Sequence, residues 1–93
     1  MRTISKTTRF KADMKRLLSG RYRQVLQDEL LPLVENLAQD VILETRFCDH
    51  ALINDWKDHR DCHLRPDLIL IYRKIGDGEL HLVRIGTHSD LGL

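Results

Sequence analysis

The chain has 93 residues, enough for a single domain (residues 1–93) with a small core, because short chains bury a modest fraction of their surface. Hydrophobic residues make up 42% of it and charged residues 31%, which is ordinary for a globular protein. No apolar run is long enough to cross a bilayer, and the basic N-terminal segment lacks the apolar stretch of a secretory signal, so we expect a cytoplasmic protein without membrane contact.

The formal net charge of +1 hides a strong asymmetry along the chain. Residues 1–27 carry eight basic residues and one acidic residue (+8 − 1 = +7), whereas residues 28–55 carry one basic and seven acidic residues (+1 − 7 = −6). A basic block of this kind favours a polyanionic partner on one face, with a solvated helix surface as the alternative. Cys48 and Cys62 form no C-x-x-C pair, so we expect two free thiols and no zinc site.

The N-terminal half predicts a short strand followed by two helices. Residues 2–5 favour a strand, and Thr7 or Thr8 can cap the helix that follows. Apolar residues of this helix recur on one stripe, at Phe10, Met14, Leu17 and Leu18. A second helical pattern covers residues 22–37 and contains Pro32, which predicts a bend near residues 28–31 or a later helix start. Residues 39–55 indicate an irregular connection.

The C-terminal half predicts three strands, at residues 56–64, 68–72 and 80–88. Residues 65–67 and 76–78 carry the turn residues between them. The unbroken apolar run at 68–72 is typical of a central strand buried on both faces. The predicted fold is therefore α+β in the order β-α-α-β-β-β, with two helices packed on one face of a small, largely antiparallel sheet.

Histidine and aspartate residues gather in the second half of the chain. Strand alternation places Asp61 and His63 on one side, and the turn at Pro66 would bring Asp67 back towards His63. His88 follows at the end of the last predicted strand. Such a set suits general acid–base chemistry near neutral pH, because an imidazole exchanges protons there and a carboxylate fixes its tautomer. Metal binding and purely structural roles are the alternatives, although the usual zinc spacings are absent.

Four segments carry a resemblance that covers nearly the whole chain. They are TTRFKADMKRL at 7–17, DHAL at 49–52 with WK at 56–57, RDCHLRPDLILIY at 60–72, and LVRIGTHSDL at 82–91. In this order they resemble the YafQ branch of the RelE-like toxins, and the likeness is weakest between residues 21 and 47. The resemblance implies a RelE-like fold and the toxin of a type II toxin–antitoxin system. It also implies an endoribonuclease that cleaves messenger RNA (mRNA) on the ribosome.

The resemblance also implies a mechanism and partners. The ribose 2′-hydroxyl attacks the adjacent phosphate without a metal or other cofactor, and a cognate antitoxin holds the toxin inactive. A toxin–antitoxin heterotetramer is one form expected of that complex. The implied catalytic residues are His50, His63, Asp67 and His88, with Asp61 and Arg84 contacting substrate. We expect His50 to be the general base, His88 the general acid and Arg84 the phosphate clamp. We also expect basic residues outside the apolar stripe to contact RNA of the ribosome or substrate, among them Lys11, Lys15 and Arg16.

This chain departs from the family pattern at its C-terminus. Many relatives carry an aromatic residue shortly after the final histidine, but here the chain ends Leu91-Gly92-Leu93, so the resemblance implies no base stacking there. A catalytically inactive module that binds RNA or protein on the same scaffold is the competing hypothesis. The combination of His50, His63, Asp67 and His88 argues against it, because binding alone does not require this set.

Overall fold

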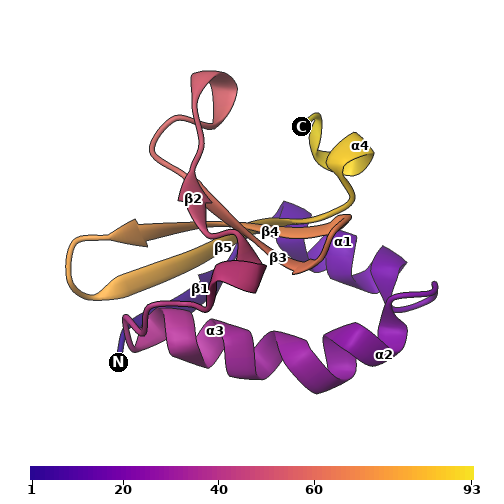
Figure 1. Ribbon diagram of the computed structural model, residues 1–93, viewed down its shortest axis with the longest axis horizontal. Helices are drawn as coiled ribbons and strands as arrows, with labels where there is room; N and C mark the ends of the chain where they lie inside the picture. Colours follow the sequence, from indigo (N-terminus) through magenta and orange to yellow (C-terminus); the bar gives the residue numbers. More distant parts are fainter.

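A five-stranded sheet forms the centre of the computed structural model, which describes residues 1–93 (Figure 1). The strand order is β1-β5-β4-β3-β2, with β1 and β5 parallel and the other neighbours antiparallel. The strands are β1 (Thr3–Lys6), β2 (His50–Ala51), β3 (Arg60–Arg65), β4 (Leu68–Ile75) and β5 (Glu79–Gly86). The prediction of a central strand at 68–72 is confirmed, since β4 lies in the middle of the sheet and these five residues are at most 1% exposed.

Two helical segments cover one face of the sheet. Helix α1 (Thr8–Leu17) starts as predicted, with the Thr7 hydroxyl accepting a hydrogen bond from the Phe10 N–H at 3.0 Å. The second segment consists of α2 (Arg23–Val25), a π-helical turn (Leu26–Leu30) and α3 (Leu31–Ala38). The wide turn lies where Pro32 predicted a bend, because proline offers no N–H to the preceding turn and its ring needs extra room.

The main core fills the space between these helices and the sheet. Each element turns its apolar residues inward, and the cluster includes Phe10, Leu17, Leu26, Leu33, Leu37, Leu70, Tyr72, Leu80 and Leu82. Truncating one such side chain to alanine would cost about 2–5 kcal/mol, a large part of the stability of a domain this small. None of the helices combines the length and apolar character that crossing a membrane requires.

Three details differ from the sequence prediction. The short strand β2 lies inside the segment that predicted an irregular connection, and β3 begins at Arg60 because residues 54–56 form a 3₁₀ turn. Strand β5 ends at Gly86 and is followed by a short helix, α4 (His88–Leu91), so His88 opens a helix instead of ending a strand. The helix begins there because Thr87 and Asp90 form a reciprocal capping box.

Candidate active site

The predicted catalytic residues gather on the sheet face opposite the long helices. In Figure 1, β2 with the loop that follows it rises on one side of this face and α4 rises on the other. Both arms rest on a small second core of Ile69, Ile71 and Leu91, against which Leu52 and Trp56 pack. Each arm carries a histidine, and β3 carries a third between them.

His50, His63 and His88 lie in a row. The ring centroids of His50 and His63 are 6.4 Å apart, and those of His63 and His88 are 5.6 Å apart. The fold thus brings together three residues that are separated by up to 38 positions in the sequence. His63 is half-buried in the middle of the row, whereas about half of the surface of each outer histidine side chain is exposed.

The environment of His50 fixes its tautomer. Its Nδ1 lies 2.7 Å from the carbonyl oxygen of Cys48 and 3.0 Å from Oδ1 of Asp61. A carbonyl oxygen only accepts hydrogen bonds, so Nδ1 carries a proton and the neutral ring has its lone pair on Nε2. No hydrogen bond within the chain occupies Nε2. His50 is therefore prepared to accept a proton from a ligand.

Asp61 is the buried carboxyl group of the site, with 2% of its surface exposed. Its Oδ1 has no hydrogen-bond partner and faces His50 at 3.0 Å and His63 Nε2 at 3.9 Å. Burial raises the pKa of the Asp61 carboxyl, an effect that the nearby charges of His50 and His63 oppose. Asp61 is therefore a buried carboxyl group that lies next to two histidines.

Asp67 pairs with His88, and not with His63 as the turn at Pro66 predicted. Its Oδ1 accepts from the His88 backbone N–H at 2.9 Å and lies 2.6 Å from the ring Nδ1. The backbone hydrogen bond, followed by the imidazole hydrogen bond, lowers the pKa of the Asp67 carboxyl, which therefore stays ionised. An ionised acceptor holds a proton on Nδ1 of His88, while Nε2 has no hydrogen-bond partner within the chain.

The turn into α4 is tightly built beneath His88. A Cβ atom on Gly86 would lie 2.8 Å from the Asp90 carboxylate, so the close approach of the capping box requires glycine at this position. Arg16 of α1 lies 3.3 Å from Asp90 and 3.7 Å from Asp13. Arg16, which the sequence predicted to contact RNA, thus connects α1 to the arm that carries His88.

Arg84 forms an ion pair with α1. Its Nε and Nη2 donate to the two oxygens of Asp13 at 2.8 and 3.0 Å, and Asp13 also accepts from the Ile85 N–H. The Ile85 N–H becomes available at a bulge in β5, where the pairing with β4 skips Val83. No hydrogen bond or ion pair joins Arg84 to the histidines, and a phosphate contact of Arg84 remains a prediction.

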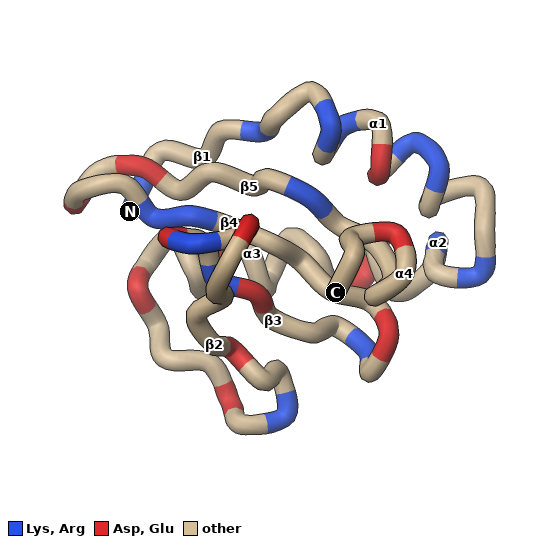
Figure 2. The backbone as a smooth tube through the Cα atoms, turned by 90° about the horizontal axis from the view of Figure 1, so that it is seen from above, with Lys and Arg blue, Asp and Glu red and all other residues tan.

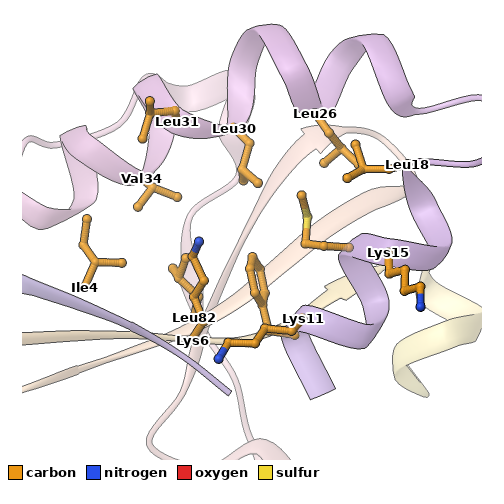
Figure 3. Close-up of a pocket in the computed structure, with 12 residues that line it drawn as sticks. Ile4, Lys6, Lys11, Lys15, Leu18, Leu26, Leu30, Leu31, Val34 and Leu82 are labelled. Atoms are coloured by element: carbon orange, nitrogen blue, oxygen red, sulfur yellow. The ribbon is translucent and has the colours of Figure 1, made fainter. Parts of the chain in front are cut away.

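Lys11 and Lys15 lie on the helix side of the molecule. Figure 2 shows basic residues recurring along α1. The two lysines border an open apolar groove between α1 and the second helical segment, which Leu26, Leu30 and Val34 line (Figure 3). The sheet separates this groove from the histidine row, so these lysines form a region distinct from the candidate active site.

Sequence reasoning missed the role of Tyr72. The prediction that it belongs to the core is confirmed, since it is 1% exposed, but its hydroxyl donates to Asp49 Oδ1 at 2.5 Å. Arg60 Nε donates to the same oxygen at 3.2 Å. Asp49 precedes His50, so this cluster fastens β2 to the sheet. A tyrosine in an otherwise aliphatic strand was the available signal, because a buried hydroxyl needs a partner.

The two thiols are free, as predicted, with Cys48 exposed and Cys62 buried. Burial raises the pKa of the Cys62 thiol, which makes this cysteine an inert core residue. Nowhere do three or more His, Cys, Asp or Glu side chains converge in a way that could hold a metal ion.

Comparison with known proteins identifies the family. Residues 2–92 match the family model described as the bacterial toxin YafQ of a type II toxin–antitoxin system. The chain belongs to the YafQ family. A curated relative, the mRNA interferase toxin YafQ of Escherichia coli, is 36% identical over 97% of this chain and 95% of its own length.

Solved structures of YafQ share the fold. The crystal structure of YafQ from E. coli superimposes with a TM-score of 0.83 at 33% identity, covering 98% of both chains. The toxin in the crystal structure of the E. coli DinJ–YafQ complex gives a TM-score of 0.78 at 34% identity over 98% of both chains. The predicted RelE-like α+β fold is therefore confirmed, with β2 and α4 as additions.

Proposed function

We propose that this YafQ-family toxin is an endoribonuclease that cleaves mRNA by metal-independent acid–base catalysis and so inhibits translation. One observation carries the proposal. Two imidazoles, His50 and His88, stand on either side of His63, and each has its Nδ1 bound to an oxygen and its Nε2 free. A transesterification needs two groups of this kind, one to remove a proton and one to supply it.

The attack begins at the ribose 2′-hydroxyl. His50 Nε2 takes the hydroxyl proton as the 2′-oxygen forms its bond to the adjacent phosphorus. Asp61 lies beneath His50 and His63, where it can balance the positive charge that develops on either ring. His63 is placed to contact the phosphate between the two outer histidines. A general base in this position contributes about 10²–10⁴-fold to the rate.

The bond from phosphorus to the 5′-oxygen breaks in the same reaction. His88 gives its Nε2 proton to the departing oxygen, and Asp67 orients the ring through its contact with Nδ1. The products are a 2′,3′-cyclic phosphate and a free 5′-hydroxyl, so the atoms and protons balance without water. His50 as base and His88 as acid are the roles that the family resemblance implies.

A ribosome and an antitoxin complete the proposed setting. The curated relative is named an mRNA interferase, and the DinJ–YafQ complex shows that E. coli YafQ assembles with DinJ. We expect this chain to bind a cognate antitoxin in the cytoplasm and, when released, to contact ribosomal RNA through Lys11, Lys15 and neighbouring basic residues. Contacts to phosphates release counterions, so binding to ribosomes should weaken steeply with salt.

Cleavage of a short mRNA bound to purified ribosomes tests the proposed function. The wild type should produce fragments ending in a 2′,3′-cyclic phosphate, and a chelator titrated to spare the ribosome's magnesium should leave the rate unchanged. Fragments that end directly in a 3′-hydroxyl would contradict internal attack. Binding of the toxin to the same ribosomes tests the RNA contact of α1. Unchanged ribosome affinity after Lys11→Glu and Lys15→Glu would contradict that contact.

A further inference from the structure

A second hollow adjoins the histidine row beside His63 and His88. It has a volume of about 520 Å³, within the usual range for ligand pockets, and opens between residues 46–48 and the turn from β3 to β4. Its wall includes His63 and His88, together with Arg46, Phe47, Arg65 and Pro66. Whatever occupies the hollow therefore lies next to the group on which the histidines act.

The lining of this hollow is cationic, because it contains two arginines but no Asp or Glu. Arg65 is occupied, since both of its Nη atoms donate to Glu29, at 2.9 and 2.6 Å. Arg46 meets only Glu44, at 3.4 Å, and both side chains are more than 60% exposed, so this pair is weak. Arg46 is thus the arginine of the hollow that remains available to a ligand.

Arg46 also lies over an aromatic ring. Its guanidinium carbon lies 4.3 Å from the centroid of the Phe47 ring, which supports one face of the cation. Phe47 itself is half-buried and packs against the main core, so the ring is a fixed base for the arginine. Proteins that bind single-stranded RNA stack unpaired bases on such guanidinium planes and aromatic rings.

We propose that this hollow binds one nucleobase of the RNA, adjacent to the scissile phosphate and stacked on Arg46. The inference rests on the proposed function, because the histidines place the phosphate and the hollow takes the neighbouring nucleoside. Stacking on Arg46 would hold the RNA with little preference among bases, because every base has a π face.

Abasic RNAs test this proposal. Three synthetic mRNAs, bound to ribosomes with an empty decoding site, are compared: one intact, one lacking the base 5′ of the cleaved bond and one lacking the base 3′ of it. For the wild-type protein, the half-saturating concentration should rise about 5- to 150-fold on one of the two abasic RNAs. Arg46→Ala should show the same loss on intact RNA and no further loss on that abasic RNA.

Two further variants separate stacking from charge. Arg46→Lys keeps the charge but loses the planar group, so it should behave like Arg46→Ala. Arg73→Ala removes the same charge from an exposed position of β4 outside the hollow and should match the wild type. Recovery of wild-type affinity by Arg46→Lys, or additive losses on both abasic RNAs, would overturn the stacking role. Either result would leave the proposed function intact, whereas a wild type that never cuts intact RNA would overturn both.

Discussion

The two histidine–carboxylate pairs of the site have the same composition but opposite electrostatics. Asp61 beside His50 is buried, and desolvation raises the pKa of its carboxyl. Asp67 beside His88 is half-exposed, and two hydrogen bonds from His88 lower the pKa of its carboxyl. Position in the fold, and not residue type, therefore shifts the pKa values of the two carboxyl groups in opposite directions.

The supports of the two pairs also differ. His50 lies on a two-residue strand that is attached by its pairing with β3 and by the Asp49–Tyr72–Arg60 cluster. His88 lies on a four-residue helix that depends on the Thr87 capping box. Neither element is long enough to be stable by itself, so both histidines rely on polar contacts made by their neighbours.

The contrast between the pairs is tested most strongly by His88→Ala. Loss of the general acid should slow mRNA cleavage by about 10²–10⁴-fold while the fold and antitoxin binding persist. Single-turnover cleavage and thermal unfolding measure the two effects. His59→Ala is the matched control and should be nearly silent, because its ring contacts only Trp56 and the Lys57 carbonyl. An active His88→Ala protein beside an inactive His59→Ala protein would move the site elsewhere.

Asp13→Ala tests the ion pair between Asp13 and Arg84. This change leaves the Arg84 guanidinium largely buried without its carboxylate, which should lower the free energy of unfolding by about 3–5 kcal/mol. Urea denaturation measures it, with Asp77→Ala in the exposed hairpin turn as the control. A loss no larger than the control's would mean that Arg84 does not depend on Asp13, and its predicted role as the phosphate clamp would gain support.

Asp61→Asn should separate activity from stability. We expect cleavage to fall by about 10²-fold or more, because the amide no longer balances charge on His50 and His63. Stability should rise, since the variant avoids the cost of burying a charge. A carboxyl whose pKa is raised by folding loses stability as pH rises through its titration. The advantage of the variant should therefore grow from acidic to neutral pH, and equal pH profiles of unfolding would contradict this.

Tyr72→Phe tests the support of the His50 arm. Removing the hydroxyl deprives the charged Asp49 carboxylate of a hydrogen-bond donor, which should lower the free energy of unfolding by about 2 kcal/mol. Cleavage should slow as well, because β2 then holds His50 less firmly. Tyr22→Phe, whose exposed hydroxyl contacts Arg21, is the control. Normal activity in a destabilised Tyr72→Phe protein would show that the cluster stabilises the fold without positioning His50.

Thr87→Ala should have the smallest effect of this series. Loss of the helix cap should cost about 1 kcal/mol, concentrated in α4. Amide hydrogen exchange of residues 88–91 should quicken, whereas exchange in β4 should stay slow. Thr87→Ser retains the capping oxygen and should restore protection. If α4 keeps its protection in the alanine variant, Leu91 packing alone holds the arm.

Local patterns predicted most of the scaffold. The cap at Thr7 and the buried strand at 68–72 follow from hydrogen-bonding capacity and hydrophobic spacing within a few residues, and both are confirmed. Before Pro32, where the sequence predicted a bend, the structure has a π-helical turn. Strand β2 and helix α4 escaped prediction because two or four residues carry too little periodicity. Their stability comes from contacts with residues far away in the chain, which no short window contains.

The sequence by itself determined that histidines and aspartates would share one surface, since alternation on β3 puts Asp61 and His63 on one face. Only the tertiary structure decided the pairing. It joined Asp67 to His88, Arg84 to Asp13 and Tyr72 to Asp49, because side chains pair through space according to which strands adjoin and where the register shifts. Burial, and with it the direction of each carboxyl pKa, likewise depends on the whole assembled sheet.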